Sequence, residues 1–242
     1  MADADKSLEA LSKTLGQSAP MDHARTIVLA ALNAVPIVGG SFATLVNAYI
    51  PERKHKRLLE FIEKVAQNVD ELKDRVSNEY VATDEFAFLF ERTFQGALDN
   101  YQKEKLDAFR AALLNALVAP ADLNAETREL YIRLVNDLTP RHIRILRALI
   151  DPPGFDQAHG MRVGSGGGMS TSLISVLRKL FPEYAEAEID YIVADLDSLA
   201  LTRMHTALRT IMTDTGIHQL EGRLTKFGQD FVLFITLPEG TT

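Results

Sequence analysis

The chain has 242 residues, of which 46% are hydrophobic and 24% charged, a balance that excludes a wholly disordered protein. It contains no cysteine, which excludes disulfides and thiolate metal sites and leads us to expect a reducing, cytoplasmic setting. The formal net charge of -7 opposes non-specific binding to nucleic acid or to an anionic membrane.

Apolar residues recur at intervals of three and four in nearly every segment, which predicts a mainly all-α fold. We expect an N-terminal helical bundle domain over 1–137 and a C-terminal winged-helix-like domain with a short β-hairpin over 138–242. Residues 1–17 lack a basic start followed by an apolar run, so we expect no signal peptide there.

Residues 27–50 carry no charge and are long enough to span a bilayer. Pro36, Gly39 and Gly40 interrupt the middle of this segment, which favours an apolar helical hairpin buried in the core. Basic residues follow immediately, so a hairpin that inserts conditionally into membranes stays open as an alternative. The residues that would act in it are Ile37, Val38, Phe42, Val46, Arg53, Lys54, Lys56 and Arg57.

A long helix is predicted over 51–77, because apolar residues there step by four and three as in a coiled coil. Pro51 suits the first turn of this helix. The seam, through which we expect self-association or partner binding, consists of Leu58, Ile62, Val65, Val69, Leu72 and Val76.

Three further helices complete the predicted bundle. Thr83 is an expected N-cap, and the helix after it places Phe86, Phe90 and Phe94 on one face, with Phe88 off that stripe. The next two helices are expected over 106–117, ending before Pro120, and over 124–138.

The second half predicts short helices in the order of a winged-helix domain. Thr139 and Pro140 form an expected N-cap and first turn, and Asp151-Pro152-Pro153-Gly154 ends that helix. A glycine-rich loop leads to helices at 170–181 and 183–199, followed by an expected hairpin with a turn at 214–216 and a last helix at 224–235. A simple continuation of the bundle is the alternative.

The third of these helices is acidic and carries no lysine or arginine, so we expect it to avoid phosphates and to meet a protein partner. DNA binding through another, arginine-bearing face stays open. The partner-binding residues we nominate are Glu183, Glu186, Asp190, Asp197, Arg141, Arg144 and Arg147.

We find no pattern typical of a catalytic, metal or cofactor site. Carboxylates on one helix converge poorly on a metal ion, and the histidines show no paired spacing. The glycine-rich stretch at 164–168 lacks the lysine of a phosphate-binding loop, and no nucleophile motif is present. We therefore expect a protein that is not an enzyme and needs no cofactor or metal.

Three segments, PIVGG at 36–40, IPERKHKRL at 50–58 and LTPRHIRILRAL at 138–149, resemble a group of uncharacterised bacterial helical proteins. The resemblance covers about 35–235 and implies an apolar hairpin, a long helix that begins with basic residues and a winged-helix-like region. Some members of the group are associated with antiviral or toxin loci, and the resemblance supplies no catalytic residues.

Together these patterns predict a non-catalytic interaction or regulatory protein, and the resemblance implies that it is bacterial and acts in a defence or stress system. A membrane-inserting effector that uses 27–50 and a DNA-binding winged-helix regulator are the two alternatives.

Overall fold

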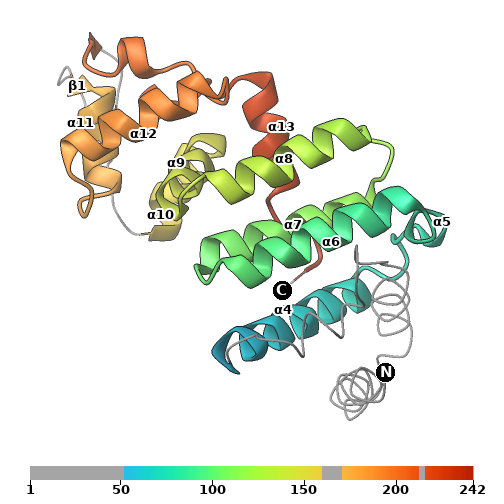
Figure 1. Cartoon of the computed structure of the whole chain (residues 1–242). Helices are drawn as coiled ribbons and strands as arrows, with labels where there is room; N and C mark the ends of the chain where they lie inside the picture. The colour runs from blue at the N-terminus through green and yellow to red at the C-terminus, as the bar shows by residue number, and fades with distance from the viewer. Residues whose placement is uncertain (1–51, 160–170, 213–215, 242) are drawn as a thin grey trace. The chain divides into compact units, whose positions relative to one another are not determined.

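The computed structural model describes residues 52–159, 171–212 and 216–241, and this part of the chain is mainly helical (Figure 1). The prediction of an all-α class is confirmed. The described residues form two compact units, one of 52–137 with 234–241 and one within 138–233. The segment from Phe234 thus groups with the first unit, and not with the predicted domain 138–242. The predicted hairpin at 27–50 lies outside the described residues.

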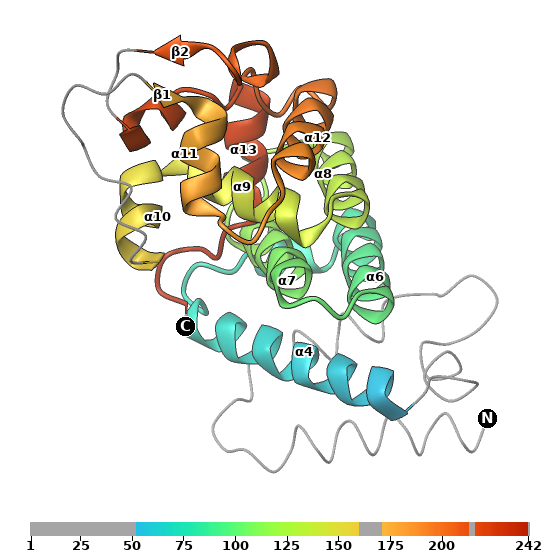
Figure 2. The same cartoon turned by 90° about the vertical axis from the view of Figure 1, so that its left-hand side faces the viewer.

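The first unit is built on a pair of packed helices, α6 and α7, with α4 and α8 each contacting both of them (Figure 2). Its helices are α4 (Glu52–Glu71), α5 (Asn78–Val81), α6 (Asp84–Asp99), α7 (Lys103–Val118) and α8 (Ala125–Asp137).

Phenylalanines form the centre of this unit, as their spacing predicts. The Thr83 side chain accepts a hydrogen bond from the Phe86 amide and so starts α6, which confirms the expected N-cap. The rings of Phe90 and Phe94 stack at 4.1 Å, and Phe61 of α4 meets Phe94 edge-on at 5.4 Å. Burial of this aromatic stripe joins α4 to α6.

The long helix predicted over 51–77 ends earlier than expected, at Glu71. The Ser77 amide donates to the Leu117 carbonyl at 3.0 Å, and the Ser77 side chain caps α5 by accepting from the Tyr80 amide. These bonds hold Ser77 outside α4, so the intervening residues form a turn. The seam from Leu58 to Leu72 is nevertheless at most 3% exposed at each position.

The last described residues run along the first unit. Asn115 Nδ2 donates to the carbonyls of Phe234 and Thr236, both at 2.8 Å, and Arg75 Nη1 donates to the Glu239 carbonyl at 2.8 Å. The rings of Tyr131 and Phe234 lie 5.6 Å apart. These contacts explain why the C-terminal segment groups with helices far from it in sequence.

The second unit contains α9 (Pro140–Ile150), α10 (Pro152–His159), α11 (Leu173–Leu180), α12 (Glu186–Ser198), and most of α13 (Lys226–Phe234). Pro140 occupies the first turn of α9 after Thr139, as predicted. Helix α10 was not predicted: the prolines that end α9 also suit the first turn of a new helix. Two short 3-10 helices, η1 (His205–Ala207) and η2 (Gly216–Leu220), follow α12.

Two short strands lie beside α11, β1 (Thr171–Ser172) and β2 (Ile211–Met212) (Figure 2). They pair antiparallel, with Thr171 opposite Met212 and Ser172 opposite Ile211. A separate antiparallel bridge joins Thr202 to Leu224. The hairpin predicted with a turn at 214–216 is not confirmed, because β2 pairs with β1 and residues 213–215 lie outside the described residues.

Candidate interaction surface

Helix α12 has one buried face and one face open to solvent. Ile189, Ile192 and Leu196 are at most 2% exposed, and α12 contacts α9 and α11. The solvent face carries Ala187, Tyr191 and Ser198, and Tyr191 is 67% exposed. We call these three residues the α12 ridge.

The arginines of α9 and the carboxylates next to α12, nominated separately from sequence, pair with one another. Arg144 Nη1 donates to Glu183 Oε1 at 2.8 Å. Arg141 Nη1 pairs with Glu188 Oε1. These residues are 39 and 47 positions apart in sequence, so packing of α9 against α12 brings them together.

Carboxylates on the other side of the ridge are also paired. Glu186 accepts from Arg209 Nη1 at 2.7 Å and from Arg178 Nη1 at 3.2 Å. Asp190 lies 3.6 Å from Arg209 Nη2 and 3.9 Å from His205 Nε2. Exposed pairs of this kind contribute little stability, about 0–1 kcal/mol each, so their main effect is to neutralise charge and orient side chains.

Two α9 arginines also lie over aromatic rings. The Arg141 guanidinium lies 4.7 Å from the centroid of the Tyr184 ring, and that of Arg144 lies 5.6 Å from both Tyr184 and Phe181. Tyr184 and Phe181 are buried and stack on each other at 5.1 Å. Burial raises the pKa of the Tyr184 hydroxyl, so the tyrosine beneath the arginines stays protonated and neutral. Each arginine is therefore fixed by a carboxylate and a ring together.

His142 connects α9 to α12 beneath the ridge. Its Nδ1 lies 2.7 Å from Thr139 Oγ1, and its Nε2 lies 3.1 Å from Asp195 Oδ2. The His142 residue is 2% exposed, and this burial lowers its pKa, while the Asp195 carboxylate opposes that shift. The rings of His142 and Tyr191 meet edge-on at 6.4 Å, so the exposed tyrosine of the ridge packs against a buried side chain.

Two nominated residues have other positions. Asp197 accepts from Thr202 Oγ1 at 2.5 Å and from the Met204 and His205 amides at 2.9–3.1 Å, so it holds the chain that leaves α12. Arg147 is half-buried in the last turn of α9. Neither belongs to the charge pairs described above on the two sides of the α12 ridge.

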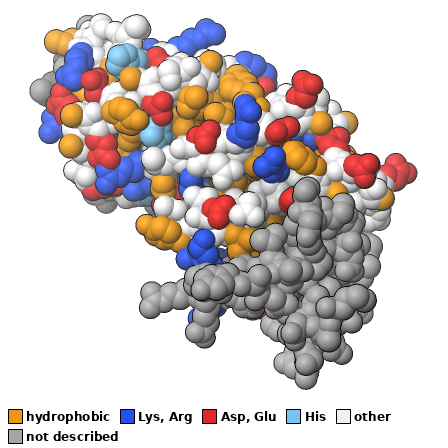
Figure 3. Space-filling view, viewed as in Figure 1, with side chains coloured by type: hydrophobic (Ala, Val, Ile, Leu, Met, Phe, Trp, Pro, Cys, Tyr) orange, Lys and Arg blue, Asp and Glu red, His pale blue; other side chains and the backbone are white. Residues whose placement is uncertain are grey.

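Positive and negative side chains are interspersed over α11 and α12 on the face that Figure 3 shows. The predicted acidic surface is therefore a mixed one, in which the carboxylates of the third helix face arginines of the same unit.

Half of the residues nominated for the membrane alternative lie outside the described part of the chain. The residues outside it are Ile37, Val38, Phe42 and Val46. Arg53 is part of α4, but its side chain is not described. Lys54 Nζ lies 4.0 Å from Asp99 Oδ1, Lys56 Nζ lies 3.9 Å from Glu60 Oε1, and Arg57 is half-buried. Among the described helices, none is both long and apolar enough to cross a bilayer. The described residues also contain no group of three histidines or carboxylates placed to bind a metal ion.

No protein-family model, no curated protein and no solved structure matches the chain. The resemblance to bacterial helical proteins stays a prediction.

Tyr191 is absent from the residues nominated from the sequence, although its spacing carries a signal. Tyr191 follows Ile189 by two positions and precedes Ile192, so it falls off the buried stripe of α12. An aromatic residue on the polar side of an amphipathic helix is a candidate contact residue.

Proposed function

We propose that the protein is a non-catalytic interaction or regulatory protein that binds a protein partner through the α12 ridge. The observation that carries the proposal is the exposed Tyr191 between two sets of paired charges. Tyrosine is enriched at the energetic centres of protein interfaces, where a polar rim around it excludes water.

Fixed rim side chains support this reading. Association usually loses free energy when long side chains become ordered, by about 0.5–1.5 kcal/mol for each. Arg141 and Arg144 are already held by carboxylates and aromatic rings in the free protein, so much of this cost is absent. A partner can dock on the ridge without reorganising it.

The order of elements in the second unit supports a winged-helix-like assignment as part of the proposal. Strand β1 follows α9 and the additional helix α10, and it is followed by α11, α12, the 3-10 helix η1 and β2. Strand β1 pairs with β2, and Thr202 bridges Leu224 at the base of the segment after α12. In that arrangement α12 stands in the recognition position. The paired carboxylates of α12 favour a protein ligand over a phosphate backbone.

Self-association through the α4 seam is not part of the proposal, because the seam from Leu58 to Leu72 is buried within the protomer. The membrane-effector alternative stays a prediction, and leakage of dye-loaded vesicles tests it. The resemblance would place the regulatory role in a defence or stress system, and the absence of cysteine favours the cytoplasm.

Site-specific photo-crosslinking in the native host tests the proposal. Tyr191 and Tyr101 form a matched pair, because they are 67% and 69% exposed and belong to different units. We expect p-benzoylphenylalanine at position 191 to trap a discrete protein partner that the same group at position 101 does not trap. Equal products from both positions, or crosslinks to nucleic acid at 191, would argue against it.

A further inference from the structure

A cleft of about 100 Å³ opens between α6 and α8 in the first unit. From α6 it is lined by Glu85, Phe88, Leu89 and Arg92, which recur at the intervals of one helix face. From α8 it is lined by Ala125, Arg128, Glu129 and Ile132, at the same intervals, with Glu126 beside them. Two parallel rows of side chains, each about two helical turns long, thus border one groove.

Phe88 gives this groove an apolar wall. Its neighbours on α6, Phe86 and Phe90, are 1% and 2% exposed, whereas Phe88 is 40% exposed. The Arg92 guanidinium lies 5.1 Å from the centroid of the Phe88 ring. Leu89 and Ile132, both nearly buried, continue the apolar surface at the floor. An apolar side chain seated here would remove this surface from water.

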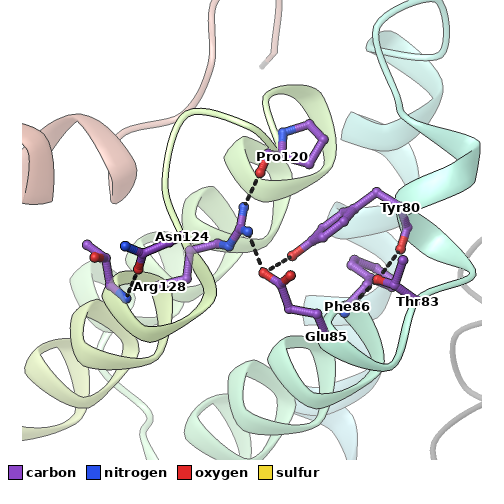
Figure 4. A network of polar contacts seen from close by, with 8 residues as sticks. Tyr80, Thr83, Glu85, Phe86, Pro120, Asn124 and Arg128 are labelled. Carbon is purple, nitrogen blue, oxygen red and sulfur yellow. Dashed lines mark hydrogen bonds and ion pairs between the residues drawn. The ribbon is translucent and has the colours of Figure 1, made fainter.

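A polar network fixes one end of the groove, as Figure 4 shows from close by. Arg128, 4% exposed, pairs with Glu85 Oε1 and donates to the Pro120 carbonyl at 2.8 Å. The Tyr80 hydroxyl donates to Glu85 Oε1 at 3.3 Å, and the Arg128 guanidinium lies 5.1 Å from the Tyr80 ring centroid. Burial raises the pKa of Tyr80 to about 12, so this end is a neutral, fixed unit at physiological pH.

The two sides of the groove differ in charge. Glu85 neutralises Arg128, and Arg92 covers Phe88 on the α6 side. On the α8 side, Glu126 and Glu129 are exposed carboxylates. The groove therefore combines an apolar floor with an acidic α8 rim, which is complementary to an apolar side chain flanked by cations.

We propose that the α6/α8 groove docks an amphipathic helix of a partner protein that bears lysine or arginine beside an apolar anchor. The anchor packs between Phe88 and Ile132, and the cations face Glu126 and Glu129. A third helix laid in the groove between two packed helices is a common mode of recognition, in which residues at i, i+3, i+4 and i+7 make the contacts. This surface is separate from the α12 ridge and does not depend on it.

A titration of the full-length, 15N-labelled protein tests the proposal. The probe is an acetylated and amidated 14-residue helix of leucine and lysine, and the charge-reversed probe replaces each lysine by glutamate. We expect the Leu-Lys helix to shift amide resonances of α6 and α8 and the Leu-Glu helix to bind at least about fivefold more weakly. Phe88→Ala should weaken binding of the Leu-Lys helix about tenfold, and Glu126→Gln with Glu129→Gln about fivefold.

Matched variants separate the groove from the general negative charge of the protein. Tyr101→Ala removes an aromatic residue that is more exposed than Phe88 and lies outside the groove lining, and Glu91→Gln with Glu104→Gln removes two charges outside that lining. Both changes should leave binding unchanged. Ala125→Arg, at an exposed rim position, should weaken binding without affecting the fold. Equal binding of the two probes, shifts that lie elsewhere, or normal binding by Phe88→Ala and Ala125→Arg would overturn the proposal.

Discussion

Arg144 of α9 donates to Glu183 at 2.8 Å across 39 positions of sequence. The pair shows that the acidic third helix and the basic stripe of α9 belong to one mixed surface. Because each side neutralises the other, neither an anionic nor a cationic partner is strongly favoured there, and Tyr191 becomes the distinguishing feature of the surface.

Removal of the carboxylates should release the arginines. We expect the variant Glu183→Gln, Glu186→Gln, Glu188→Gln, Asp190→Asn to bind duplex DNA, with affinity that falls about a hundredfold between roughly 50 and 200 mM salt if four phosphates are contacted. The natural protein should show no such binding. Fluorescence anisotropy of a labelled duplex measures both, and Glu60→Gln, Glu79→Gln, Glu104→Gln, Asp122→Asn gives the same change in net charge elsewhere. Salt-dependent binding by the natural protein would instead support the DNA-binding alternative.

The buried His142 should make stability fall in mild acid. Burial lowers its pKa in the folded protein below the ordinary value of 6.5, so folding favours the neutral ring. The stabilisation is complete above about pH 6.5 and is lost as the pH falls through the lower folded value. Urea unfolding at pH 7.5 and 5.5 should show a smaller loss for His142→Gln than for the natural protein. Asp195→Asn should steepen the loss, because the carboxylate that raises the pKa is gone; a gain in stability towards pH 5.5 would contradict this sign.

Glu85 should matter more for stability than other carboxylates of the groove. It is the counter-charge of Arg128, whose side chain is 5% exposed, so Glu85→Ala leaves a buried cation with carbonyl and ring contacts alone. We expect a loss of about 3 kcal/mol in the free energy of unfolding. The exposed Glu129→Ala should change it by less than about 0.5 kcal/mol. Equal urea midpoints for the two variants would show that the pair does not stabilise the fold.

Gly228 allows α13 to approach the chain that follows α12. A Cβ atom at this position would lie 2.0 Å from the Leu201 carbonyl oxygen, a backbone atom that the Thr225 amide also contacts at 3.1 Å. We expect Gly228→Ala to cost about 2–3 kcal/mol despite the higher helix propensity of alanine. Gln229→Ala, at the next and exposed position, should be within about 0.5 kcal/mol of the natural protein. A Gly228→Ala protein as stable as the parent in thermal unfolding would exclude this close approach.

Local signals made much of the helical fold predictable. Thr83 and Thr139 each precede a helix as expected, and the phenylalanines four apart on α6 are buried. The sequence did not predict features that depend on a contact between residues far apart in the chain. The Ser77 amide donates to the Leu117 carbonyl, and the α4 region ends early. The expected hairpin is not confirmed, because β2 pairs with the distant strand β1.

The candidate surface was predictable in its residue types but not in its pairing. The charges on 141–147 and 183–197 are visible in the sequence, but the distance between Arg141 and Glu188 depends on how α9 packs on α12. Tyr191 and Phe88 each fall off a buried stripe, which is a signal of exposure. The packing of the neighbouring helices determines that Phe88 borders a groove and that Tyr191 lies on a ridge.

The central claim is tested most directly by a binding measurement with the partner trapped at position 191. Its affinity is compared for the purified natural protein, Tyr191→Ala and Tyr101→Ala. If the α12 ridge is the binding surface, Tyr191→Ala should weaken binding about thirtyfold, as expected for a central interface tyrosine, while Tyr101→Ala binds like the natural protein. Equal affinities of the natural protein and Tyr191→Ala would contradict the assignment of function to this ridge.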